Sequence, residues 1–306
     1  MERYRHPVLL YSLIAFTILA WSCNFVIAKA AISYLDAWSM TSFRIILSGA
    51  LMLPIYFWTP HRAKIHSKDV WTFVILGFFG VVMNRGLFIV GLHYTTAGHS
   101  ALIVAVGPVI ILLLARMMKL EVITLPKVLG MALSFIGVIV LVGGDELHLR
   151  SGGWVGDLIT IGGTTGFAIF TVMAKKVAQH YDTISLNTFC NLAGAIIVLP
   201  LGIRQAARLD WSSVGWQGWT GLAYTAVISS VIAYLIYFWA LKHVAASRLA
   251  ACTYAETPIA AFLSIMLLGE KPTAALIFGA VLILAGVYLA EFWREIEEVP
   301  PDTAGA

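Results

Sequence analysis

Residues 8–28 of the 306-residue chain read VLLYSLIAFTILAWSCNFVIA and contain no charged side chain. A helix needs about 20 such residues to cross the hydrocarbon core of a bilayer. The whole chain has the same character, since 60% of its residues are hydrophobic, 12% are charged and the mean hydropathy is +0.87. Soluble domains carry about 25% charged residues, and a soluble fold of this composition would expose large apolar patches. We therefore predict an integral membrane protein and exclude a soluble enzyme, a disordered protein and a nucleic-acid binder.

Nine further apolar stretches follow the first. The ten predicted spans cover residues 8–28, 38–58, 70–90, 97–117, 125–143, 154–174, 184–203, 215–240, 247–268 and 273–293. The segments between them are too short for an extramembrane domain, and continuous apolar runs do not fit the alternating strands of a porin. We predict an all-α membrane protein with ten transmembrane helices. The first span is expected to be retained, because a signal peptide has an apolar core of only about 7–15 residues.

Basic residues predict how the chain is oriented. Loops on the cytoplasmic side of membrane proteins carry an excess of Lys and Arg. With ten spans, thirteen such residues lie on the side of both termini and five on the opposite side. We expect a protein of the bacterial inner membrane with both termini in the cytoplasm. Arg44 and Arg85 fall within spans near the outer interface, where we expect them to extend toward water; a site for a substrate carboxylate is the alternative.

The two halves of the chain, residues 1–148 and 149–306, resemble each other. Shifts of 146 and 149 residues align matching positions, among them Lys29 with Lys175, Asp36 with Asp182, Glu121 with Glu270, Gly130 with Gly279 and Gly137 with Gly286. Each half holds five predicted spans, so the second copy should enter the membrane in the opposite orientation. Inverted repeats around a central midplane site are typical of secondary transporters. A duplicated channel or structural protein is the alternative.

Several stretches resemble a known family. They are ALKH (240–243), ETP (256–258), LLGE (267–270) and GAVLILAG (279–286), with weaker versions in GLHYTTA (91–97) and KLE (119–121). Over its whole length the chain is similar to EamA-type members of the drug/metabolite transporter superfamily. This resemblance implies a ten-helix fold and transport, but no particular substrate. Length and aromatic content are most similar to bacterial exporters of aromatic and other amino acids. The first span lacks the glutamate that couples protons in the small multidrug antiporters of the superfamily.

Two prolines occupy corresponding spans, Pro108 in the fourth and Pro258 in the ninth. Proline has no N–H, so a carbonyl one turn earlier loses its helical partner. In lipid that carbonyl needs protein, water or substrate. We predict that both helices break here, with Gly107 as a second weak point, and that the breaks form a hinge or a polar patch. A simple packing kink is the alternative.

Glu256 is the acidic residue that lies deepest within a predicted span. Because burying a carboxylate in a membrane is costly, Glu256 should face a partner or a wet cavity. Its expected role is to bind a substrate ammonium or to carry a proton, and a hydrogen-bonded structural role is the alternative. Polar and aromatic residues in the other spans complete the predicted cavity, because aromatic walls accept flat apolar solutes. These are Trp21, Asn24, Phe79, Asn84, Arg85, His99, Tyr234 and Tyr254.

The sequence contains no phosphate-binding loop, no His/Cys cluster at metal spacing and no nucleophile with a base in view. We predict no enzyme, no catalytic residue, no cofactor and no metal. The predicted function is export of small amphipathic metabolites, amino acids above all, by a monomer whose partners are its substrate and the lipid bilayer. The alternatives are a nucleotide-sugar or phosphate-ester exchanger, for which only Arg44 and Arg85 offer cations, an organic-cation exporter, and a membrane scaffold or sensor.

Overall fold

The computed structural model describes residues 7–60, 62–94, 100, 103–142, 154–268 and 274–292. In the first half the helices are α1 (Pro7–Ala31), α2 (Ala37–Trp58), η1 (Ser67–Asp69), α3 (Val70–Leu76), η2 (Gly77–Leu87), α4 (Phe88–Tyr94), α6 (Gly107–Met117) and α7 (Leu125–Val142). In the second half they are α8 (Trp154–Val177), α9 (Thr183–Arg208), α10 (Trp216–Tyr224), η4 (Thr225–Ile232), α11 (Ala233–His243), α12 (Ala246–Cys252), η5 (Thr253–Ala255), α13 (Glu256–Leu268) and α14 (Ala274–Phe292). No strand occurs among these residues, which confirms the all-α prediction.

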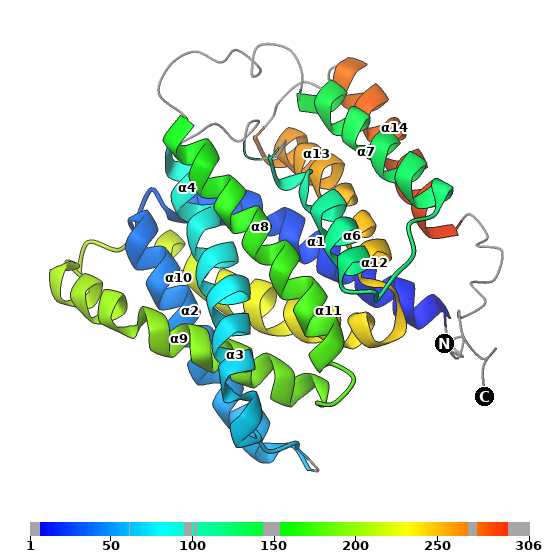
Figure 1. The fold of residues 1–306 in the computed structure, drawn as a ribbon. Coiled ribbons are helices and arrows are strands. Elements are labelled where there is room, and N and C mark those ends of the chain that lie inside the picture. Colours follow the sequence, from blue (N-terminus) through cyan, green and yellow to red (C-terminus); the bar gives the residue numbers. More distant parts are fainter. Residues whose placement is uncertain are drawn as a thin grey trace, which may run out of the picture.

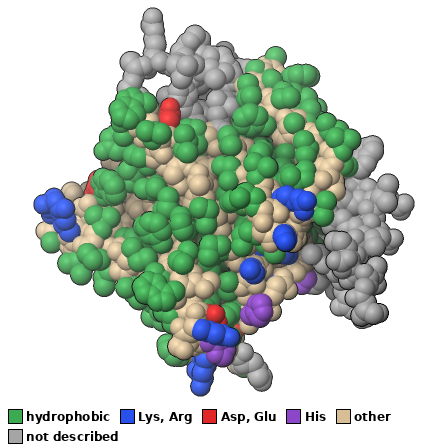
Figure 2. All heavy atoms as spheres, viewed as in Figure 1, with side chains coloured by type: hydrophobic (Ala, Val, Ile, Leu, Met, Phe, Trp, Pro, Cys, Tyr) green, Lys and Arg blue, Asp and Glu red, His purple; other side chains and the backbone are tan. Residues whose placement is uncertain are grey.

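Six continuous helical segments of the described residues are long and apolar enough to cross a membrane. They are Val8–Ala28, Ala37–Trp58, Ser67–Gly91, Trp154–Val177, Thr183–Arg208 and Trp216–His243, and three shorter apolar helices accompany them, Gly107–Met117, Leu125–Leu141 and Ile277–Ala290. Hydrophobic side chains cover most of the surface seen in Figure 2. Such a surface suits contact with lipid tails, so the chain is a multi-pass membrane protein.

The fourth and ninth predicted spans, which contain Pro108 and Pro258, are not continuous helices, whereas α2 and α9 stay continuous across Pro54 and Pro200. In the fourth, a turn at Ala105 and Val106 precedes α6. The ninth consists of α12, the 3-10 turn η5 and α13. Breaking a helix inside a membrane is tolerated where protein or a cavity surrounds the freed backbone groups. In Figure 1 both segments lie between α1 and the pair α7–α14, within the bundle.

The helix pairs α2–α9 and α7–α14 join the two halves of the chain. In the pair α7–α14, glycines of one helix face glycines of the other. In each helix the glycines are seven residues apart, which places them on the same face. A Cβ atom on Gly137 would lie 2.7 Å from the backbone nitrogen of Ile283 and 2.8 Å from the carbonyl oxygen of Gly279. The hydroxyl of Ser134 donates to the carbonyl of Ile283 at 3.1 Å. Small residues let the two backbones approach this closely, which is how membrane helices gain contact area.

Matching aspartates begin the matching helices α2 and α9. The Oδ1 atom of Asp36 accepts hydrogen bonds from the backbone N–H groups of Trp38 and Ser39, both at 3.1 Å. The Oδ1 atom of Asp182 accepts from the backbone of Ser185 at 2.9 Å. Partial burial acts to raise the pKa of Asp182, but the hydrogen bonds that its carboxylate accepts outweigh this and hold the pKa below its ordinary value. Both carboxylates satisfy N–H groups that a helix leaves free at its start.

The close approach of α7 and α14 predicts that Gly137→Leu destabilises the protein. The new side chain would overlap the α14 backbone, which cannot move aside as a flexible side chain would. Overpacking of this kind costs about 1–3 kcal/mol of unfolding free energy. Thermal unfolding in detergent should show a lower midpoint for this variant. Ile136→Leu, on the exposed face of the same helix, is the control and should leave the midpoint unchanged. Equal midpoints for the two variants would contradict the packing described.

Candidate functional site

Helices from both halves of the chain enclose a cavity of about 790 Å³, its open side included. The wall of the cavity is formed by residues of helices α1, α2 and α8, of the segments η2 and η4, and of the breaks before α6 and α13. The lining residues are Trp21, Asn24, Phe25, Arg44, Asn84, Arg85, Phe88, Val104, Gly107, Pro108, Thr160, Gly163, Thr164, Phe167, Ser229, Tyr234, Thr253 and Glu256.

Aromatic rings form one wall of the cavity. The ring of Trp21 lies 5.1 Å from that of Tyr234, 5.3 Å from that of Tyr237 and 6.2 Å from that of Phe167. The indole N–H of Trp21 donates to the backbone carbonyl of Ser229 at 3.1 Å, so the ring is held in place. Phe170 packs behind Tyr234, with ring centroids 6.2 Å apart. We call these five rings the aromatic layer.

A second, much smaller space also borders Trp21. Its lining includes Ile14 and Ile18 of α1, Ala240 of α11 and Leu249 of α12, and it shares Trp21 and Thr253 with the larger cavity. Trp21 and Thr253 therefore border both spaces.

Both arginines of the predicted spans are buried, with exposed fractions of 4% for Arg44 and 3% for Arg85. The expectation that they extend toward water is therefore wrong. The Nε atom of Arg44 donates to the hydroxyl of Ser230 at 2.9 Å, and its Nη2 atom donates to that of Ser229 at 3.3 Å. These serines lie on a helix distant in the sequence, and for this reason the sequence did not reveal the hydrogen bonds that hold the guanidinium inside.

Arg85 is held by two contacts of different kinds. Its Nη1 atom donates to the side-chain oxygen of Asn191 at 2.6 Å. Its guanidinium carbon lies 3.7 Å from the centre of the Tyr234 ring, which is close cation–π contact. The side-chain amide of Asn84, the preceding residue, donates to the Tyr234 hydroxyl at 2.9 Å. Neighbouring residues of one segment thus bind the face and the hydroxyl of the same ring.

The two segments that carry these groups are π-helical. They are η2, with Asn84 and Arg85, and η4, with Ser229 and Ser230. π-Helical turns are rare in proteins, and those that occur are often found at functional sites. The two segments begin at Gly77 and Thr225, corresponding places in the two halves. Their wider turns shift the side chains that follow, and this shift could not be read from a periodicity of 3.6 residues.

The helix breaks also border the cavity. Gly107 and Pro108 begin α6 and line the cavity with Val104. Glu256 begins α13 and lines it too, and its backbone carbonyl accepts a hydrogen bond from the hydroxyl of Ser22 at 3.2 Å. Pro258 is buried two residues further on. The chain changes its helical form just before each proline, while hinge motion at these places stays a prediction.

The structure brings together most of the residues proposed from the sequence. Trp21, Asn24, Asn84, Arg85, Tyr234 and Glu256 line the cavity, as do Gly107 and Pro108. Three others do not line it: Phe79 packs against the main core, Tyr254 packs in a cluster with residues of α7 and α14, and Pro258 is buried elsewhere. His99 lies outside the described residues. Lining residues that the sequence did not single out include Thr160, Thr164, Ser229 and Thr253, because small polar residues in apolar helices give no distinctive signal.

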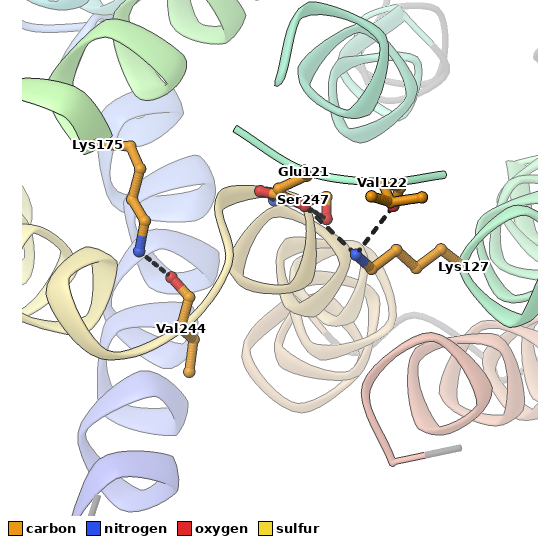
Figure 3. A network of polar contacts seen from close by, with 6 residues as sticks. All are labelled: Glu121, Val122, Lys127, Lys175, Val244 and Ser247. Carbon is orange, nitrogen blue, oxygen red and sulfur yellow. Dashed lines mark hydrogen bonds and ion pairs between the residues drawn. The ribbon is translucent and has the colours of Figure 1, made fainter. Parts of the chain in front are cut away.

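Charged side chains hold the connection between α11 and α12. One of them, Lys175, lies about 12 Å along α8 from Phe167. Figure 3 shows Lys175 of α8 pointing at the carbonyl of Val244, to which its Nζ atom donates at 2.6 Å, and it also donates to the carbonyl of Leu241. The carboxylate of Glu121 accepts from the backbone N–H of Ser247 at 3.1 Å and from its hydroxyl. Lys127 lies 3.5 Å from the same carboxylate. A cation thus binds the C-terminus of α11 and an anion the N-terminus of α12, as the helix dipoles favour.

Comparison with known proteins identifies relatives of the whole chain. The model of the EamA-like transporter family matches residues 8–143 and residues 154–292. The uncharacterized transporter YyaM of Bacillus subtilis is 26% identical over 291 residues, which cover 94% of this chain and 94% of that protein. An uncharacterized transporter of Archaeoglobus fulgidus is 26% identical over 282 residues, covering 90% and 95% of the two chains.

More distant similarity extends to plants and to a solved structure. A WAT1-related protein of Arabidopsis thaliana is 25% identical over 254 residues, covering 74% of this chain and 65% of that protein. A crystal structure of another protein matches with a TM-score of 0.74 and 19% identity, covering 92% of this chain and 96% of the other. At that identity the structural match shows the shared fold alone.

The contacts of Lys175 predict that Lys175→Met destabilises the protein. The buried carbonyls of Leu241 and Val244 would lose their donor, and an unsatisfied buried polar group costs about 1–3 kcal/mol. The thermal unfolding midpoint in detergent should fall. The neighbouring Lys176 is exposed, so Lys176→Met is the matched control and should change stability by less than about 0.5 kcal/mol. A midpoint for Lys175→Met equal to that of the control would show that its hydrogen bonds do not support the connection.

Proposed function

The chain belongs to the EamA-like transporter family, and from this premise we propose that it exports small amphipathic metabolites, amino acids above all, across the bacterial inner membrane. The observation that carries the proposal is the cavity, which combines an aromatic wall with buried arginines and a carboxylate from both halves of the chain. Such a site suits a solute with a flat apolar body and a charged head, as an aromatic amino acid has.

We propose that ten spans in two inverted repeats build this transporter. The family model matches once in each half. The pairs α2–α9 and α7–α14 bring matching helices of the two halves together, and the π-helical segments recur at matching places. Helix α1 begins and helix α14 ends on the same side of the bundle (right in Figure 1), which an even number of spans requires. The excess of basic residues supports a cytoplasmic location for that side.

Alternating access is the proposed mechanism. Trp21 borders both spaces, and the smaller one is also lined by Ala240 and Leu249, near the α11–α12 connection that Lys175 and Glu121 bind. Moving a solute across requires Trp21 to give way and these contacts to rearrange. The helix breaks at Pro108 and Pro258 supply places where the backbone lacks a complete ladder and bends at lower cost. We expect the monomer to carry out this cycle.

A phosphate-ester exchanger is the second candidate. It requires cations in the cavity, and the burial of both Arg44 and Arg85 at the cavity favours it more than the sequence did. The aromatic wall and the small number of cations favour the amino-acid proposal.

Flux in proteoliposomes that contain only this protein tests the proposed function. Liposomes are loaded with unlabelled amino acids, and uptake of labelled phenylalanine, tryptophan, methionine or threonine is followed with and without a proton gradient. Saturable uptake that other aromatic amino acids reduce is the expected result. Folded protein that moves none of these solutes, but exchanges sugar phosphates or organic cations, would replace the proposal with an alternative.

Glu256→Gln should reduce this flux by at least tenfold while the protein stays folded. The change removes the carboxylate that lines the cavity and keeps the shape of the side chain. Initial uptake rates are compared with those of Asp210→Asn, an exposed loop residue, at matched amounts of monodisperse protein. Undiminished flux in the Glu256 variant would remove this side chain from the transport mechanism.

A further inference from the structure

The cavity contains more positive than negative side chains. Among the lining residues, two are arginines, Arg44 and Arg85, and one is acidic, Glu256. No carboxylate of the described residues forms an ion pair with either arginine. A buried guanidinium without a counter-charge is costly in a membrane protein. The arrangement therefore favours a negatively charged group entering from outside the chain.

Arg85 leaves one edge of its guanidinium without a partner. Nη1 donates to Asn191, whose own side-chain amide donates to the backbone oxygen of Asn187 at 2.8 Å and to the side-chain oxygen of Asn187 at 2.6 Å. This network and the Tyr234 ring fix the orientation of the guanidinium. The Nε and Nη2 atoms are buried and have no hydrogen-bond acceptor. Nε and Nη2 form the edge of arginine that donates two parallel hydrogen bonds to a carboxylate.

Arg44 cannot offer the same edge. Its Nε and Nη2 atoms already donate to Ser230 and Ser229. Ser230 in turn donates to the carbonyl of Thr225 at 2.7 Å, which fixes its hydroxyl as an acceptor for Arg44. Arg44 thus adds positive charge to the cavity, whereas Arg85 adds positive charge together with two unsatisfied donors.

Two further lining residues carry buried polar atoms without a partner, the side-chain oxygen of Asn24 and the hydroxyl of Thr164. Buried polar groups are nearly always hydrogen-bonded in proteins. Three such residues around one cavity are therefore informative. A polar solute in the cavity would complete the hydrogen bonding of these residues.

We propose that the Nε–Nη2 edge of Arg85 binds the carboxylate of the substrate, and that the cavity selects small apolar carboxylates over amines of the same shape. The proposal rests on the proposed function, since it assigns the substrate class of the same cavity. One carboxylate with no other charge balances the two arginines and Glu256. A zwitterion can place its carboxylate at Arg85 and its ammonium group at Glu256, and the site then keeps one positive charge at Arg44. An amine without a carboxylate leaves both arginines unbalanced and the edge of Arg85 empty.

The structure favours a carboxylate over a phosphate ester. One free guanidinium edge provides two donors, which a planar carboxylate satisfies. A phosphate group presents three terminal oxygens, and the free edge of Arg85 can pair with only two of them. The half-buried rings of Trp21 and Phe167, which line the cavity, provide apolar surface for the body of the solute.

Four probes of similar shape test this assignment on the full chain in detergent. They are 3-phenylpropionate, phenylalanine, phenethylamine and phenyl phosphate, which share a ring and differ in charge. Affinity is measured by the concentration dependence of the thermal unfolding midpoint. We expect 3-phenylpropionate to bind at least tenfold more tightly than phenethylamine and phenyl phosphate. Equal affinity for phenethylamine, tighter binding of phenyl phosphate or no binding of any probe by folded protein would overturn the proposal.

Arg85→Lys keeps the positive charge and removes the two-donor edge, since lysine and arginine are not interchangeable at a bidentate site. This variant should weaken 3-phenylpropionate binding by about tenfold or more. Arg204→Lys, an exposed position on α9, is the control and should bind as the unchanged protein does. Glu256→Gln should not weaken 3-phenylpropionate binding, but it should weaken that of phenylalanine. Unaltered carboxylate binding by folded Arg85→Lys would refute the role of Arg85.

The binding measurements and the flux assay test the two proposals independently, so one can fail without the other. If labelled amino acids are transported but the affinity of the probes does not depend on their carboxylate or on Arg85, the proposed function stands and the substrate assignment is wrong. If 3-phenylpropionate binds through Arg85 but no solute in the panel is transported, the assignment stands and the proposed export of amino acids is wrong.

Discussion

The hydrocarbon of a bilayer offers no hydrogen-bond partners, and every polar group within the spans must therefore find one in the protein. Helices satisfy this constraint for the backbone, and the described residues are accordingly helical between their connections. The same constraint applies to side chains, so a polar side chain within the spans needs a hydrogen-bond partner in the protein. Arg44 is fixed by two serines, Asn187 donates to the carbonyl of Val231 at 3.3 Å, and Lys175 takes carbonyls that α11 leaves free at its end. Each contact joins segments that are far apart in the sequence.

The same constraint explains where the backbone departs from regular helix. The breaks before α6 and α13 and the π-helical segments η2 and η4 all contribute to the walls of one cavity. On lipid-facing surfaces such departures would leave carbonyl or N–H groups in hydrocarbon. Around a cavity they face protein, water or a solute. The irregular backbone is thus concentrated around the cavity, where the proposed cycle would need polar groups and bending points.

Sequence reasoning could predict the features that depend on composition and local chemistry. The apolar runs predict the helices, and the proline positions predict where the fourth and ninth spans are interrupted. The isolation of Glu256 and the polarity of Asn24 and Asn84 predict lining residues. Sequence reasoning placed Arg44 and Arg85 in the wrong environment, because their partners Ser230 and Asn191 come from helices that only the fold brings near. Phe79 and Tyr254 are apolar enough to belong to either a core or a cavity, and only packing decides between these positions.

The two arginines explain how the cavity can be stable when empty and still favour an anion. A guanidinium held by stacking and by one strong hydrogen bond keeps its orientation without a counter-ion, as Arg85 does between Tyr234 and Asn191. Had a protein carboxylate occupied its free edge, the charge would be neutralised and the cavity would have no preference for an anion. Leaving the edge empty costs stability, and binding of the proposed carboxylate would recover that cost. A transporter must also release that solute, and one two-donor edge beside an apolar wall binds less tightly than a fully paired pocket. Incomplete satisfaction at Arg85 therefore suits a site that is filled and emptied in every cycle.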